Sequence, residues 1–196
     1  MQLKSKSTSY GTVAVVLHWP SALLILGMIP LGFLMQRADE SAQFLLYRGH
    51  VAVGVVVLGL TLARLTWKLF DTRVLPAPGL VGVHLWGMVG IHVLLYVGLL
   101  ALLVSGVILN VQSDLIEVIK GNSGAEIPDL SRFTARGAHG KLARIYIGLL
   151  IAHIGGVIIH QVRHGHVLVR MGVGRDQSKV AISNSVVDGE EAERHQ

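Results

Sequence analysis

Histidine is the residue type in this chain that is best placed to do chemistry inside apolar sequence. The 196 residues include ten histidines and no cysteine, which excludes disulfides, thiolate metal sites, iron–sulfur clusters and covalently attached haem. Neutral imidazole is a good ligand for transition metals and for haem iron. Four histidines that lie in or near the ends of long apolar runs are the candidate metal ligands: His18, His50, His139 and His153.

The apolar runs around these histidines are long enough to cross a membrane, which takes about 20 helical residues. They cover approximately residues 13–35, 45–69, 83–111 and 138–162. The chain is 52% hydrophobic and 15% charged, against about 25% charged in an ordinary soluble domain. We therefore predict an all-α integral membrane protein whose four transmembrane helices form a bundle. Residues 1–175 are predicted to be one domain and the polar residues 176–196 a disordered cytoplasmic tail.

The basic residues predict the orientation of the spans. An even number of spans places both termini on one side, which carries Lys4, Lys6, Arg64, Lys68, Arg73, Arg163, Arg170 and Arg175. The other side carries Arg37, Arg48, Lys120, Arg132, Arg136 and Lys141. Eight cations against six favour cytoplasmic termini by the positive-inside rule. The net charge of +5 comes with no basic patch interleaved with aromatic residues, so nucleic acid is not an expected partner, whereas membrane lipid is.

Helical spacing predicts that the four candidate ligands form two pairs. His139 and His153 are 14 residues apart, which in a helix is about 21 Å of depth and about 40° from the same direction. They therefore share one helix face at two depths. The topology places His18 at the depth of His153 and His50 at the depth of His139. Two interhelical pairs are expected, one near each membrane surface.

Two facing imidazoles can ligate the iron of a b-type haem from both sides. Two such haems would form an electron path across the bilayer, and their propionates would need basic partners. Arg64 and Lys68 are candidates for the inner haem, and Arg48, Arg136 and Lys141 for the outer one. The competing interpretation is that each histidine is an interhelical hydrogen-bond donor. Four histidines at matched depths favour a function, because polar residues inside spans are costly.

The other histidines allow several roles. His92 and His160 lie in the inner halves of the third and fourth spans, where each could contact a propionate or a quinone head group, or extend to the interface. For the remaining four we expect solvated positions at helix ends or in the tail: His84, His164, His166 and His195. A zinc or copper site formed by His160, His164 and His166 stays open as an alternative.

Short motifs in all four spans resemble the bacterial cytochrome b561 family, which is related to the cytochrome b subunit of nickel–iron hydrogenases. The motifs are Leu17-His18-Trp19, GHVAVG at 49–54, ARLTWKL at 63–69, HVLLY at 92–96 with Ser105-Gly106, AHGKLA at 138–143 with His153 and His160, and LVRM at 168–171. The resemblance extends approximately from Tyr10 to Met171. This chain departs from the family pattern at Met88 and Gln161, where histidines are common.

The resemblance implies a bundle with two haems b in a bacterial inner (plasma) membrane. His18 and His153 would ligate the inner haem, and His50 and His139 the outer one, as the depth argument predicts independently. Members of the family are linked to quinone chemistry, including the oxidation of superoxide coupled to ubiquinone reduction. The resemblance therefore implies ubiquinone or another quinone as a partner.

Three functions follow as hypotheses. The first is an electron-transfer cytochrome between an outer-face, periplasmic donor and the quinone pool. If superoxide is the donor, the protein is an oxidoreductase, and the outer cations Lys120, Arg132, Arg136 and Lys141 steer the anion or clamp a propionate. The second is a membrane-anchor subunit that accepts electrons from a hydrogenase, dehydrogenase or soluble cytochrome. The third is a transporter or scaffold without haem, which predicts broken helices or inverted repeats that the sequence does not clearly show.

Overall fold

The computed structural model describes residues 2–77, 81–120, 127–165 and 167–174. Within these residues all regular elements are helical. The long helices are α1 (Thr12–Leu34), α2 (Glu40–Phe70), α3 (Gly82–Gln112) and α5 (Thr134–His164), and the short ones are α4 (Leu115–Ile119), the 3₁₀ turn η1 (Leu130–Arg132) and α6 (Val167–Arg170). All four long helices are apolar and long enough to span a membrane. The predicted fold is confirmed, while the predicted disordered tail, 176–196, lies outside the described residues.

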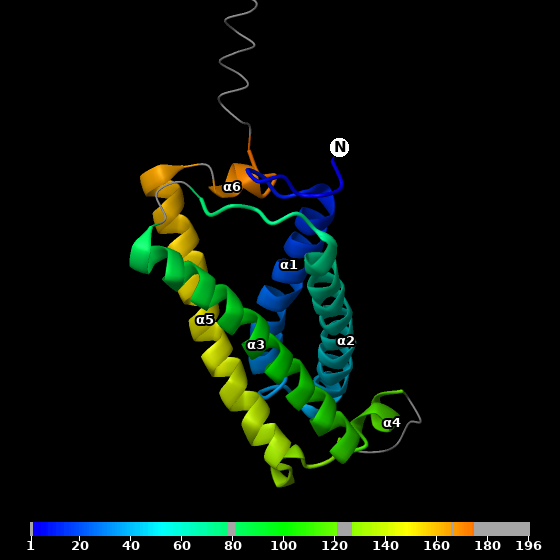
Figure 1. The fold of residues 1–196 in the computed structure, drawn as a ribbon. Coiled ribbons are helices and arrows are strands. Elements are labelled where there is room, and N and C mark those ends of the chain that lie inside the picture. Colours follow the sequence, from blue (N-terminus) through cyan, green and yellow to red (C-terminus); the bar gives the residue numbers. More distant parts are fainter. Residues whose placement is uncertain (1, 78–80, 121–126, 166, 175–196) are drawn as a thin grey trace, which may run out of the picture.

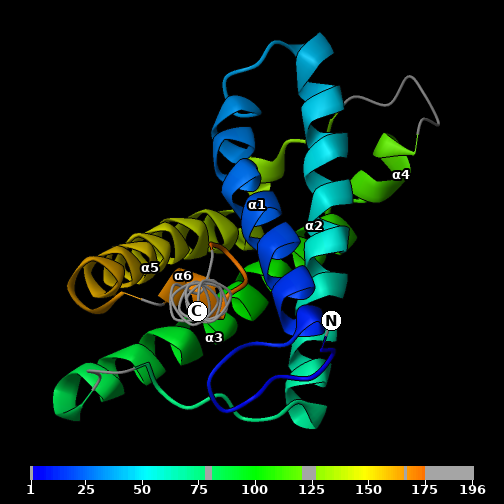
Figure 2. The same cartoon turned by 90° about the horizontal axis from the view of Figure 1, so that it is seen from above.

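The long helices pack as two pairs. α1 lies along α2 and α3 lies along α5, whereas contact between the pairs is sparse and runs chiefly through α2 and α3. Figures 1 and 2 show that the pairs cross at an angle and separate toward the end where the N-terminus and α6 lie. We call this end the terminal end and the opposite one, with α4 and η1, the loop end. We call the interface between the α1–α2 pair and the α3–α5 pair the seam. Side chains from different pairs can meet only there.

Two apolar clusters hold the seam together. The middle cluster takes one buried residue from each long helix: Ile25, Val57, Leu99 and Tyr146. The cluster at the loop end includes Leu115 of α4 and Leu130 of η1, each less than a tenth exposed. These two side chains hold α4 and η1 against the bundle. η1 in turn lies directly before the start of α5.

Most apolar side chains on the long helices face outward, because lipid is their solvent. At most 17% of the most apolar part of any span is buried inside the protein. Two fully buried hydroxyls bond within their own helices: Ser21 donates to the Leu17 carbonyl at 2.6 Å and Thr61 to the Val57 carbonyl at 2.7 Å. Such bonds satisfy hydroxyl groups where water is absent. The spans are thus single helices with lipid-facing surfaces and a thin protein core.

Polar contacts close the terminal end. The backbone nitrogen and hydroxyl of Ser5 donate to the Asp71 carboxylate at 2.7 and 2.6 Å. Trp19 Nε1 donates to the Met171 carbonyl at 3.1 Å, and the Arg170 guanidinium donates to a carbonyl of the α2–α3 linker. Slight burial raises the pKa of Asp71, but hydrogen bonds from Ser5 and Thr72 outweigh it and leave the pKa below its usual value. The ionised carboxylate therefore ties the N-terminal segment to α2 at neutral pH.

The close packing of α3 against α5 depends on a glycine. A Cβ atom at Gly98 would lie 3.3 Å from a ring carbon of Tyr146 and 3.4 Å from a methyl group of Leu149. A Cβ at Gly148 on α5 would meet nothing within 4 Å. The two glycines therefore form a matched pair for testing this packing.

We expect Gly98→Leu to lower the thermal unfolding temperature of the purified protein in detergent, because overpacking of a filled interface costs about 1–3 kcal/mol. Gly148→Leu should leave that temperature unchanged or raise it slightly, because glycine inside a helix costs about 0.5–1 kcal/mol relative to alanine. Equal unfolding temperatures for the two variants would contradict the close contact between α3 and α5.

Candidate functional site

A pair of imidazoles faces across the seam near the loop end. His50 of α2 and His139 of α5 have ring centroids 6.2 Å apart and ring planes at 76°. His50 Nδ1 is buried and has no hydrogen-bond partner among the described residues. A metal ion bound by two imidazole nitrogens at about 2 Å each would separate the ring centroids by about 6 Å. The spacing of this pair fits one metal ion between the rings.

Glycine leaves room for both rings. A Cβ at Gly106 on α3 would lie 3.3 Å from His139 Cε1, and one at Gly32 on α1 would lie 3.8 Å from His50 Cε1. The His139 ring therefore rests directly against the backbone of α3. Gly106 belongs to a family-like motif, but the sequence alone assigns it no role, since the rotation of α3 toward α5 is not fixed by the motif.

Polar and charged groups surround His50 and His139, which we call the outer pair after the outer site that the sequence predicts for them. His139 Nδ1 lies 2.9 Å from Ser105 Oγ, and Ser105 Oγ lies 2.7 Å from the Leu102 carbonyl. Arg136 is within electrostatic range of both His50 and His139. The sequence predicts Arg136 beside a propionate, and the structure places it at the histidine pair. The sequence gives Ser105 no role beyond its place in a family-like motif, because a serine in an apolar helix usually bonds only its own backbone.

A second group of histidines lies toward the terminal end. His92 of α3 and His153 of α5 have ring centroids 5.1 Å apart at 79°, and His18 of α1 is within electrostatic range of both. An Arg64 Nη atom lies 3.1 Å from His18 Nδ1. Their equal depth in the membrane predicts that His18 and His153 form a pair. The structure places both in one group, but the ring that contacts His153 is the ring of His92.

Two cations lie beside His18, His92 and His153, which we call the inner group. The Arg64 guanidinium is 5.5 Å from the centroid of the Tyr96 ring, and Lys68 Nζ is 5.1 Å from it. Both residues are on α2, one helical turn apart, and the sequence predicts that both serve haem propionates. Their common position over one aromatic ring brings two positive charges to the edge of the inner group.

His160 lies apart from the inner group, nearer the terminal end. Its ring centroid is 4.6 Å from that of His164, and both of its ring nitrogens are buried without a hydrogen-bond partner in the described part of the chain. Among the described residues, no group of three or more His, Cys, Asp or Glu side chains surrounds a common point. The zinc or copper alternative gains no support from these residues, and His166 lies outside them.

A pocket of about 420 Å³ opens at the loop end, beside the start of α5. It is lined by Ser131, Arg132, Phe133, Thr134, Gly137, Ala138 and Lys141. Ala138 is next in sequence to His139, so the pocket opens at the end of α5 that carries this histidine. Two cations and two hydroxyls in its lining suit a small anion.

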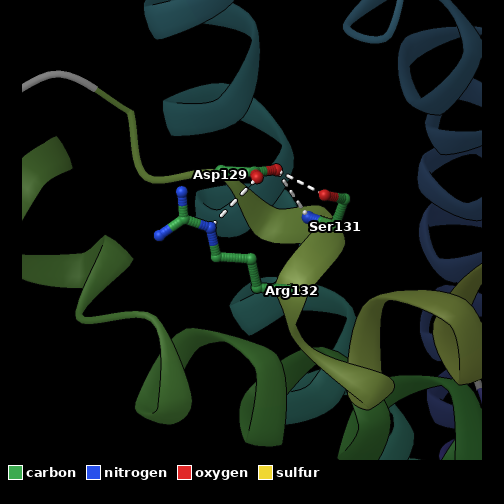
Figure 3. Close-up of polar contacts among 3 residues, drawn as sticks. All are labelled: Asp129, Ser131 and Arg132. Carbon is green, nitrogen blue, oxygen red and sulfur yellow. Dashed lines mark hydrogen bonds and ion pairs between the residues drawn. The ribbon is translucent and has the colours of Figure 1, made fainter.

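One of these cations is already paired. Figure 3 shows Asp129 accepting hydrogen bonds from the backbone nitrogen and hydroxyl of Ser131 at 3.0 and 2.6 Å and from Arg132 Nε at 3.2 Å. The hydrogen bond from the Ser131 side chain, followed by that from its backbone and by Arg132, lowers the pKa of Asp129. Asp129 therefore stays ionised at neutral pH and offsets the charge of Arg132. Lys141 has no ion pair with a described residue.

Comparison with known families decides the class of the protein. The family described as prokaryotic cytochrome b561 matches residues 9–174, which include all four spans. The chain belongs to this family. It is thus a multi-pass membrane protein of a b-type cytochrome family that acts in electron transfer. A comparison with individual curated proteins finds no match.

The residues of the outer pair fit the haem that family membership implies. A b-type haem is flat, is held without covalent bonds and takes neutral imidazoles as axial ligands. The facing rings, the unpartnered His50 Nδ1 and the glycine backbone against His139 match those needs. The inner group supplies imidazoles and cations as well, with Arg64 at the Nδ1 atom of His18.

Proposed function

We propose that this cytochrome binds two haems b and carries electrons across the membrane between a donor on its outer face and a quinone. The observation that carries the proposal is the pair of His50 and His139 across the seam, together with a second histidine group deeper along the same helix. Bound haem supplies the one-electron carrier, and the chain supplies its ligands, its charge partners and its place between the helix pairs.

In the outer site, His50 and His139 are the proposed axial ligands. Gly106 and Gly32 keep side chains away from the rings, and Arg136 is the proposed partner of a propionate. Because the two proposed ligands come from opposite helix pairs, a haem held by them would join α2 to α5. Haem binding should therefore strengthen a seam that the protein alone packs sparsely.

In the inner site, His18 and His153 are the proposed axial ligands. A haem-ligating imidazole usually donates a hydrogen bond from its other nitrogen, whereas Arg64 donates to His18 Nδ1. Arg64 is therefore expected to turn from His18 to a propionate when haem occupies the site, with Lys68 beside it. His92, whose ring contacts the His153 ring, would then lie beside the haem.

The quinone is proposed to bind near His160, toward the terminal end. Both nitrogens of this ring lack a partner among the described residues, so it can hydrogen-bond a quinone oxygen. The excess of cations at the terminal end favours both termini in the cytoplasm of a bacterial cell, with the protein in the inner membrane. The loop end and its pocket then face the periplasm.

The ligand pairing predicts which substitutions affect the same haem. His50→Ala and His139→Ala should each remove one haem per chain and leave the same residual absorption spectrum. His18→Ala and His153→Ala should remove the other haem. The measurement is haem content per chain by pyridine haemochrome, with the reduced-minus-oxidised spectrum. His84→Ala, an exposed histidine at the start of α3, is the control and should keep both haems. Full haem content in the four variants would refute the ligand assignment.

The loop-end pocket favours a small anionic donor such as superoxide. Its cations Arg132 and Lys141 lie near the start of α5, the helix that carries His139, and a positive pocket raises the local concentration and arrival rate of an anion. The alternative function, a membrane anchor that accepts electrons from a protein partner, requires that partner for reduction. Reduction of the purified protein by superoxide alone would separate the two.

Asp129→Asn should increase the rate of haem reduction by superoxide severalfold at low ionic strength, since it frees the positive charge of Arg132. The increase should shrink as salt screens the pocket. Stopped-flow absorbance with a neutral reductant in parallel measures both effects.

Glu117→Gln is the matched control, because it frees Lys120 from an exposed ion pair of 2.8 Å outside the pocket lining. Its effect should be smaller than that of Asp129→Asn. Lys141→Gln should slow the reaction. If none of these variants changes the rate with superoxide, the pocket is not the entry point of an anionic donor.

A further inference from the structure

The hydrogen count at Ser105 determines which nitrogen of His139 carries a proton. The hydroxyl has one hydrogen and two close neighbours, the Leu102 carbonyl at 2.7 Å and His139 Nδ1 at 2.9 Å. A carbonyl oxygen can only accept, so the hydroxyl hydrogen points to Leu102. The contact with His139 is then a hydrogen bond only if Nδ1–H donates to the Ser105 oxygen.

A neutral imidazole has one N–H group, so a proton on Nδ1 leaves the lone pair of Nε2 free. We propose that Ser105 is a positioning residue that holds His139 in the tautomer whose Nε2 ligates haem iron. This inference rests on the proposed role of His139 as a haem ligand. Ser105 would not bind the iron itself, but it would fix both the tautomer and the ring orientation of the ligand His139.

The surroundings of Ser105 suit this role. Ser105 is 8% exposed, so little water competes for the His139 proton. Gly106, the next residue, lets the ring lie against α3, since a Cβ there would be 3.3 Å from His139 Cε1. The short bond from the Ser105 hydroxyl to Leu102, in the same helix, fixes the direction of the oxygen lone pairs.

The other proposed ligands lack such an acceptor in the described part of the chain. His50 Nδ1 has no partner, and the group at His18 Nδ1 is a guanidinium, which donates. His139 is thus prepared to ligate before haem arrives, whereas His18 must first lose its bond from Arg64. Removal of Ser105 should therefore affect the outer haem and spare the inner one.

The test uses the full chain purified with its haems. Ser105→Ala should raise the dissociation rate of one haem by about tenfold, the scale of effect seen when a partner of a metal ligand is lost. It should also shift the low-spin ferric EPR g-values of that haem and raise its midpoint potential, because a weaker acceptor makes the imidazole a weaker electron donor. The signals of the other haem should not move.

Ser105→Thr and Ser105→Val are variants of nearly the same shape that differ in the hydroxyl group. Thr should restore the native EPR signal and Val should not, which separates hydrogen bonding from packing if Ser105→Ala folds poorly. Ser21→Ala is the matched control: it removes an equally buried hydroxyl, bonded to the Leu17 carbonyl at 2.6 Å, with no hydrogen bond to a histidine among the described residues. Its EPR spectrum should be native.

Native dissociation rate, g-values and potential in both Ser105→Ala and Ser105→Val would overturn the role of Ser105. If His139→Ala still loses one haem in that case, the proposed function stands and only this inference fails. If His139→Ala keeps both haems, the ligand assignment fails, and the inference fails with it.

Discussion

The two helix pairs of this protein meet at imidazole rings as well as at apolar side chains, and the proposed electron path depends on that meeting. A polar ring at membrane depth has no water to bond, so the protein or a bound group must satisfy it. His50 and His139 come from opposite pairs, and His50 Nδ1 has no partner among the described residues. A haem iron between the rings would satisfy both residues and join the pairs.

The two proposed haem sites differ in how well contacts within the protein orient their histidines for binding iron. At the outer site, His139 is tied to α3 through Ser105 and rests on the backbone at Gly106. At the inner site, His18 is held by Arg64, a group that competes with the ligating tautomer. If both sites bind haem as proposed, the inner site would resist haem binding more than the outer one. This difference would be a physical basis for unequal affinities and unequal potentials of the two haems.

Sequence was sufficient for the membrane fold, because hydropathy and length set the four spans directly. Helical spacing also predicted the depth of each histidine in the membrane. In agreement with those depths, the structure places His50 beside His139 and His18 in one group with His153. Their role as haem ligands stays a prediction. What sequence could not supply is the rotation of each helix about its axis. That rotation puts the ring of His92 against His153.

The same limit explains why the sequence assigns Ser105 and Gly106 no individual role. Their contacts with His139 join two helices, and Ser105 is 34 positions away from that histidine. The fold of the α3–α5 connection escapes prediction for a different reason. Leu115 and Leu130 are buried against the bundle there, and the sequence does not show which of the apolar side chains near them turn inward.

The central claim is that two haems per chain are each held by two imidazoles. Low-temperature EPR of the oxidised, purified protein, with spins counted against the concentration of the chain, tests it most directly. We expect two distinct low-spin ferric signals, each integrating to about one spin per chain. A single low-spin signal of one spin per chain, or a high-spin signal from a haem with an open axial position, would contradict it.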